Sequence, residues 1–173
     1  FLTKPLGVGI LTTAQKKEKL LPEHHSIARD NMIRLNKIGE VFGKLPYVKA
    51  MTDVTGFGLL GHLSEMCEAS DVSAVLDFSK VPTIDKNTLD YYKAAKCIPG
   101  GTHRNWDSYG HKIALLTDEQ KFILADPQTS GGLLVAVEPE RVADFQIVAK
   151  ENGLELEAFG EVVDKKEWLV EVQ

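Results

Sequence analysis

The segment from Tyr47 to Cys67 constrains the fold more than any other part of this sequence, because a strand, a glycine turn and a helix follow one another within it. Residues 47–54 (YVKAMTDV) have the pattern of a short strand. The next four residues, Thr55 to Gly58, contain two glycines, which favours a tight turn. The apolar residues that follow recur at helical spacing: Leu59, Leu63, Met66 and Cys67. The pattern predicts a strand that passes through a glycine turn into a helix.

The rest of the chain alternates between short strand-like and helix-like segments. We expect further strands at residues 6–12, 72–78, 122–125, 133–137, 154–158 and 168–172. We expect one long helix over 22–43, a helix after a cap at Asp85 or Thr83 that runs to Ala95, and a helix from Pro139 to just before Gly153. Residues 98–112 show no periodicity and are rich in turn formers, which predicts a long loop. No repeat or linker divides the chain, so residues 1–173 are expected to form one domain.

Charge and cysteine content limit the classes of function. The chain has 20 Lys and Arg against 25 Asp and Glu, and this net charge of −5 argues against nucleic acid as a partner. The two cysteines, Cys67 and Cys97, form no Cys-x-x-Cys pattern, which favours a reducing compartment such as the cytoplasm and core packing for each thiol. No apolar run approaches the roughly 18 to 20 residues that span a bilayer, so no membrane association is expected.

The glycines of the turn allow two interpretations. Gly56-Phe-Gly58-Leu-Leu-Gly61 has the G-x-G-x-x-G spacing of a dinucleotide-binding turn, and Asp77 follows about 20 residues later. The chain would then be a non-enzymatic nucleotide- or dinucleotide-binding module. Alternatively, the glycines serve only a tight turn and close helix packing, and we expect alanine at Gly56 or Gly58 to destabilise the domain. Asp53, three residues before Gly56, would repel a bare pyrophosphate, but as a ligand of Mg²⁺ it would hold the cation beside phosphate oxygens.

The residues around Asp53 favour its role as a Mg²⁺ ligand. Residues 50–62 (AMTDVTGFGLLGH) resemble the signature of the selenophosphate synthetase (selenide, water dikinase) family. Four other segments resemble that family in the same order: residues 2–11 (LTKPLGVGIL), 28–32 (ARDNM), 99–105 (PGGTHRN) and 126–134 (DPQTSGGLL). The resemblance covers essentially the whole chain, but only the C-terminal half of the family's proteins. It implies an α+β fold with helices packed on a mixed sheet, as in the C-terminal domain of aminoimidazole ribonucleotide synthetase.

The resemblance also implies a reaction and its cofactors. The family forms selenophosphate, AMP and orthophosphate from selenide, ATP and water, with Mg²⁺ holding the nucleotide phosphates. The reactive cysteine or selenocysteine, its lysine partner and most nucleotide contacts lie in the family's N-terminal half. We therefore expect the chain, which begins at Phe1, to be one domain of a larger two-domain enzyme, to carry no catalytic residue of its own and to be inactive alone. The parent enzyme is expected to be a homodimer.

Few positions of this chain are candidate site residues. Asp53 is the one position that matches a metal-binding aspartate of the family. A phosphate-facing group is expected at Gly100, Gly101, Thr102, Arg104 and Asn105, with a plain surface loop as the alternative. Residues 128–132 (QTSGG) offer similar chemistry, although their pattern slightly favours a plain tight turn. His24 and His25 are expected at a solvated helix start. His62, nine residues after Asp53, is expected on an exposed helix face, with a place near the site as the alternative.

Overall fold

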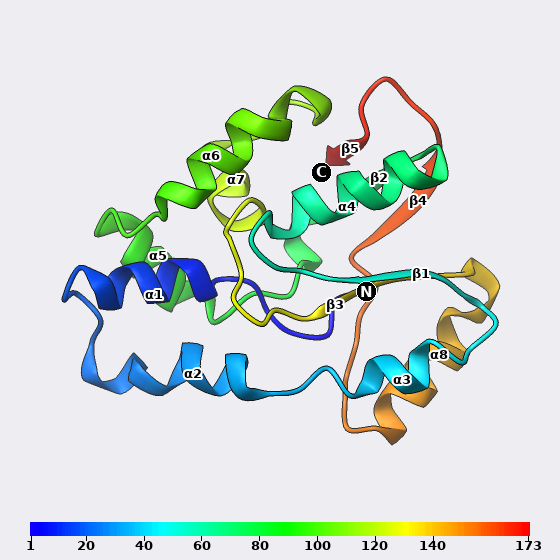
Figure 1. Cartoon of the computed structure of the whole chain (residues 1–173), viewed down its shortest axis with the longest axis horizontal. Helices are drawn as coiled ribbons and strands as arrows, with labels where there is room; N and C mark the ends of the chain where they lie inside the picture. Colours follow the sequence, from blue (N-terminus) through cyan, green and yellow to red (C-terminus); the bar gives the residue numbers. More distant parts are fainter.

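Two small β-sheets form the centre of the fold, and helices surround them (Figure 1). The computed structural model describes all residues, 1–173. The strands are β1 (Val48–Asp53), β2 (Val72–Leu76), β3 (Leu133–Val137), β4 (Gly160–Asp164) and β5 (Val170–Val172). The α-helices are α1 (Val8–Lys16), α2 (His25–Ile33), α3 (Ile38–Phe42), α4 (Gly58–Ser70), α5 (Lys86–Ala94), α6 (Gly100–Tyr109), α7 (Asp118–Leu124) and α8 (Val142–Glu151). The 3₁₀ turns are η1 (Pro22–His24), η2 (Phe78–Lys80), η3 (Gly110–Lys112) and η4 (Pro139–Arg141).

The first sheet joins β1 to β3 in antiparallel register, with Asp53 opposite Leu133. The start of the chain runs beside β3, where Leu2 bridges to Leu134. The N-terminus therefore lies at the middle of the molecule (Figure 1). The end of β1 that carries Asp53 is thereby placed next to the residues that precede β3.

The second sheet has the strand order β4-β2-β5. Strand β2 pairs with β4 in antiparallel fashion and with β5 in parallel, so this sheet is mixed. Together with the surrounding helices it confirms the expected α+β class.

The hydrophobic core consists of two groups of buried side chains. The larger group, of 28 residues, lies among α1, α4, α5 and the second sheet and includes Leu11, Leu59 and Tyr92. The smaller group lies at the other end of the molecule, where Phe42 of α3 packs on Phe145 of α8 with ring centroids 4.6 Å apart. Each Å² of apolar surface that is buried contributes about 25 cal/mol to the free energy of folding, so these two groups are the main source of stability.

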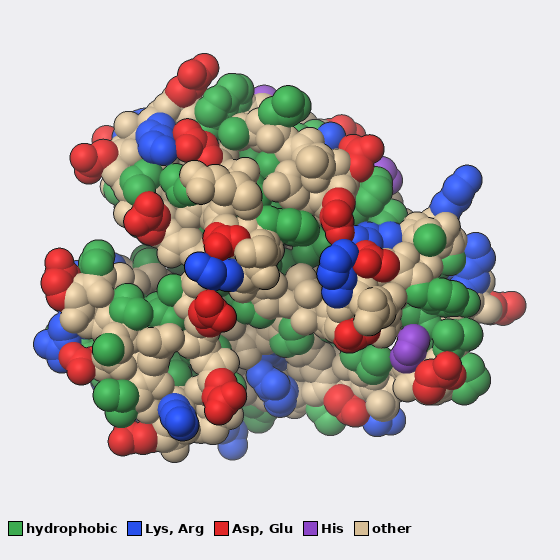
Figure 2. Space-filling view, turned by 180° about the vertical axis from the view of Figure 1, so that it is seen from behind, with side chains coloured by type: hydrophobic (Ala, Val, Ile, Leu, Met, Phe, Trp, Pro, Cys, Tyr) green, Lys and Arg blue, Asp and Glu red, His purple; other side chains and the backbone are tan.

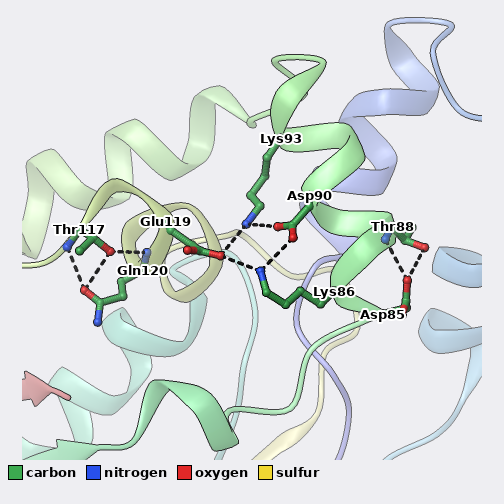
Figure 3. A network of polar contacts seen from close by, with 8 residues as sticks. All are labelled: Asp85, Lys86, Thr88, Asp90, Lys93, Thr117, Glu119 and Gln120. Carbon is green, nitrogen blue, oxygen red and sulfur yellow. Dashed lines mark hydrogen bonds and ion pairs between the residues drawn. The ribbon is translucent and has the colours of Figure 1, made fainter.

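Polar side chains connect α5 to α7 across the surface (Figure 3). The ammonium groups of Lys86 and Lys93 both lie near Glu119 of α7, at 3.1 and 3.2 Å, and both also contact Asp90. Each helix is capped by a side chain: Asp85 accepts from the Thr88 amide, and Thr117 and Gln120 form a capping box. The predicted cap at Asp85 is confirmed.

Several sequence expectations are confirmed, and others are wrong. Four of the expected strands are present with small shifts at their ends: 47–54, 72–78, 133–137 and 168–172. The structure also contains the expected helices that start after Gly56, Asp85 and Pro139. The long helix over 22–43 is instead η1, α2 and α3, because Arg34 takes an extended conformation that ends α2. The expected strand at 154–158 is absent, and β4 follows it at Gly160–Asp164.

Three further errors exchange helix for strand or loop. Residues 6–12 lead into α1 and residues 122–125 fall largely in α7, because short apolar runs fit a buried helix as well as a strand. The expected loop at 98–112 contains α6, whose buried residues Thr102, Asn105 and Tyr109 have helical spacing. None of the helices combines the length and apolar character that crossing a bilayer requires.

Candidate functional site

The turn between β1 and α4 presents Asp53 at an open edge of the first sheet. Asp53 is the last residue of β1 and is exposed, and its carboxylate makes no hydrogen bond or ion pair within the chain. Two residues later, the carbonyl oxygen of Thr55 accepts from the amide of Gly58 at 3.0 Å and from that of Gln128 at 2.9 Å. The turn is thus fixed, whereas the carboxylate beside it remains available to a ligand.

Two side chains of α6 donate hydrogen bonds to backbone carbonyl groups of the turn. The Asn105 side-chain amide donates to the carbonyl oxygens of Gly56 at 2.8 Å and Ala125 at 3.0 Å. The hydroxyl of Tyr109 donates to the carbonyl oxygen of Phe57 at 2.6 Å, and burial raises the pKa of this phenol. Both residues belong to the segment expected to be a loop, so the support of the turn was not visible in the sequence pattern.

Gly58 is required by the turn, whereas Gly56 is not. Gly58 has φ +70°, and a Cβ there would lie 2.8 Å from the backbone carbon of Ala125. A Cβ at Gly56 would meet no atom within 4 Å, and Gly56 has no positive φ. The expectation that both glycines are needed is therefore supported for Gly58 and wrong for Gly56.

His62 braces the turn from α4. One ring nitrogen lies 3.1 Å from the hydroxyl oxygen of Thr55, and the other lies 3.1 Å from a carboxylate oxygen of Glu65. The His62 side chain is only 11% exposed. The expectation of an exposed helix face is wrong for this residue, because the turn folds back over the first turn of α4.

The loop over residues 126–132 packs against the turn that follows Asp53. The carboxylate of Asp126 is fully buried and accepts from the Gly9 amide at 2.9 Å and from the Gln128 side chain at 2.7 Å. Burial raises the pKa of Asp126 to about 7. Gly131 packs so tightly on the Val54 carbonyl oxygen that a Cβ has no room. The loop therefore combines a tight turn with a buried cap for α1, and its polar groups at 126 and 128 serve the protein itself.

The predicted phosphate-facing residues lie on the first two turns of α6 and divide into two groups. Thr102 and Asn105 are buried, and the Asn105 amide is used by the turn. Gly100 and Arg104 are exposed, and Gly101 is half-buried. The structure brings Asn105 to the turn that follows Asp53, where its amide supports the turn. Within this segment, the groups that remain free to contact a phosphate are therefore chiefly the Arg104 side chain and the backbone of α6.

Asp53 stands alone as a candidate metal ligand. No group of three or more His, Cys, Asp or Glu side chains is arranged to hold a metal ion. A single exposed carboxylate fits Mg²⁺, which commonly takes one or two carboxylates and completes its shell with phosphate oxygens and water. The donor set of this chain therefore suits a shared magnesium site in which other ligands come from elsewhere.

The remaining polar candidates have structural partners. Cys67 and Cys97 are both buried, as expected, and burial raises the pKa of the Cys67 thiol to about 11. A ring nitrogen of His24 lies 2.8 Å from the Tyr92 hydroxyl, whereas His25 is exposed near the carbonyl of Leu20. Burial or a contact within the chain therefore accounts for each of these residues.

The topology argues against the dinucleotide-binding interpretation. Such a site requires two parallel strands of one sheet joined by the helix. Here β1 and β2 belong to different sheets, and the carboxylate of Asp77 accepts from the amide and hydroxyl of Ser79. The spacing of Gly56, Gly58 and Gly61 therefore arises from the turn and from helix packing.

Comparison with known proteins identifies a family and related sequences. Residues 1–172 match the family described as AIR synthase related protein, C-terminal domain. The selenide, water dikinase of Pseudomonas putida is 58% identical over 172 residues, which cover 99% of this chain and 49% of that protein. The selenide, water dikinase of Yersinia pestis is 54% identical over 174 residues, with the same coverage of 99% and 49%. The chain spans about half the length of these curated relatives.

Solved structures of low sequence identity share the fold. The thiamine-monophosphate kinase of Stenotrophomonas maltophilia superposes with a TM-score of 0.65 at 16% identity, over 99% of this chain and 48% of that protein. The hydrogenase maturation protein HypE of E. coli gives a TM-score of 0.56 at 18% identity, over 95% of this chain and 43% of that protein. At this identity the likeness concerns the architecture alone.

Proposed function

The chain belongs to the family of C-terminal domains of AIR synthase related proteins, and we propose that it forms the C-terminal half of a selenide, water dikinase. The reaction would convert selenide, ATP and water into selenophosphate, AMP and orthophosphate. The observation that carries this proposal is the 58% identity to a selenide, water dikinase over 99% of the chain. The same resemblance supports a cytoplasmic, homodimeric parent enzyme.

We assign Asp53 the role of a magnesium ligand. Its carboxylate is exposed at a strand end, is free of protein partners and stands beside a turn that three side chains and a neighbouring loop hold in place. Bound Mg²⁺ would neutralise the charge of the nucleotide phosphates. Asp53 would supply one oxygen ligand, and the rigid turn would keep that oxygen in position. Arg104, exposed on α6, is the side chain of the predicted phosphate-facing group that remains free to contact an anion.

The chain alone is proposed to be inactive. Both cysteine thiols are buried, and no group of three or more His, Cys, Asp or Glu side chains is arranged to hold a metal ion. A single carboxylate supplies too little affinity to retain Mg²⁺. The nucleophile, the lysine and most of the nucleotide site would come from the N-terminal half of the same enzyme.

The test compares the chain with the full-length enzyme that contains it. Selenide-dependent formation of AMP from ATP is measured for both proteins at equal concentration, with heat-denatured samples as the blank. The proposal expects activity from the full-length enzyme and none above the blank from the chain. Absence of selenide-dependent AMP from a folded, nucleotide-binding full-length enzyme would exclude the assigned reaction, and activity of the chain alone would exclude the proposed dependence on the other half.

A further inference from the structure

A hollow of about 320 Å³ lies between the start of the chain, the link from α2 to α3, and the end of α8. We call it the Lys4 hollow. Its polar lining residues are Thr3, Lys4, Arg34, Asn36, Lys37 and Asn152. Its volume lies at the lower end of the range for small-molecule sites.

The charge of this hollow differs from that of the rest of the molecule. Lys4, Arg34 and Lys37 all contribute cationic groups, and no Asp or Glu is among the lining residues. None of the three cations forms an ion pair in the chain, although the chain carries a net charge of −5. Elsewhere acidic and basic side chains are interspersed, as Figure 2 shows for one face. Three unpaired cations around one concave surface create a positive potential that attracts an anion.

Lys4 is the unusual member of this group because it is buried. The residue is only 3% exposed, and its ammonium makes one hydrogen bond, to the carbonyl oxygen of Ser130 at 2.6 Å. An ammonium has three donors, so two remain for a ligand. Burial and the neighbouring charge of Arg34 lower the pKa of Lys4. A buried cation beside a second cation is costly unless an anion compensates both charges.

Arg34 is similarly held by one backbone carbonyl group, that of Thr3, and is free at its other donors. One guanidinium nitrogen donates to the carbonyl oxygen of Thr3 at 2.8 Å, which fixes the side chain over the hollow. A guanidinium has five N–H donors in a planar fork that suits two oxygens of a phosphate. The protein uses one of the two terminal nitrogens in this contact and leaves the remaining donors available.

We propose that the Lys4 hollow binds a phosphate group, which Lys4, Arg34 and Lys37 hold by charge-assisted hydrogen bonds. The choice of phosphate over other anions rests on the proposed function, whose substrate and products include phosphates. The hollow is linked to the Asp53 site by the loop over 126–132. Lys4 and Asn36 bind the carbonyl oxygens of Ser130 and Gly131, and Gly131 packs on Val54, next to Asp53.

Isothermal titration and ³¹P NMR of the full 173-residue chain test the proposal with orthophosphate and with magnesium-free ATP as separate probes. We expect saturable binding of at least one probe, weakened about tenfold or more by Arg34→Gln and by Lys4→Met, since one charge-assisted bond contributes about 1.5–3 kcal/mol. Lys16→Gln, at an exposed lysine at the end of α1, removes the same charge and should change the affinity less than about twofold. Binding of orthophosphate would identify a free phosphate as the ligand, and binding of ATP alone would identify the phosphates of a nucleotide.

The outcomes separate this proposal from the proposed function. Absence of binding by either probe, or equal weakening by Arg34→Gln and Lys16→Gln, would overturn the phosphate site. Arg34 is exposed, so its variant decides the matter even where Lys4→Met does not fold. No selenide is present in the titration, so the result is independent of whether the full-length enzyme forms selenophosphate.

Discussion

The backbone amide of Gly9 donates to the buried carboxylate of Asp126 at 2.9 Å, although 117 residues separate the two positions. Asp126 thereby caps the first turn of α1 from the loop that also approaches Asp53. Its second oxygen, Oδ1, has no hydrogen-bond partner. The carboxyl group is therefore held in an environment that favours its protonated form.

This arrangement predicts a pH-dependent stability. The pKa of Asp126 rises from about 3.8 to about 7 on folding, so between these values the native chain holds a proton that the unfolded chain has lost. The free energy of unfolding should consequently fall as the pH rises from about 4 to about 7. Asp126→Asn removes this contribution. Urea unfolding across this pH range should show that the wild type loses stability relative to the variant, and parallel curves would show that Asp126 does not titrate in this way.

The two glycines of the turn should respond differently to alanine. Gly58→Ala combines a positive φ with a collision against Ala125, and it should lower the free energy of unfolding by about 1 kcal/mol or more. Gly56→Ala meets no neighbour and should change stability by less than about 0.5 kcal/mol. Thermal and urea unfolding of both variants provide the comparison. Equal losses would mean that the turn is not held as described.

Asn105 should contribute more to stability than an exposed asparagine does. Asn105→Ala removes a buried hydrogen bond to the Ala125 carbonyl oxygen and a partly buried one to the Gly56 carbonyl oxygen, and it should cost about 2 kcal/mol. Asn87→Ala, on the exposed face of α5, is the matched control and should be close to neutral. A neutral Asn105→Ala in the same unfolding experiment would show that water satisfies both carbonyls.

The sequence predicts the strand, turn and helix around Asp53 well because their signals are local. The glycines, the strand pattern and the helical spacing all lie within residues 47–67. The supports of the turn were missed because they come from distant segments. Asn105 and Tyr109 lie on α6, whose first residues, Gly100 and Gly101, are typical of a loop. The helix is stabilised instead by its packing on α4 and α7, which no local pattern indicates.

Other errors have the same origin. The T-x-x-Q pattern at Thr117 is a capping-box signature, yet the apolar run that follows reads equally well as a strand. The end of α2 at Arg34 carries no glycine or proline signal. Arg34 is extended there and binds the carbonyl oxygen of Thr3, a contact across 31 residues that no local pattern encodes.

The central claim is that Asp53 supplies a magnesium ligand to a selenide, water dikinase, and a magnesium titration of the full-length enzyme tests it most directly. Selenide-dependent AMP formation is measured for the wild type, Asp53→Asn and Asp164→Asn. Asp164 is the matched control because it is likewise an exposed aspartate at the last position of a strand. We expect Asp53→Asn to lose most of the turnover, or to need far more Mg²⁺ to reach it, while the control variant stays at the wild-type rate and both variants remain folded. Wild-type turnover by Asp53→Asn at the same magnesium concentrations would contradict it.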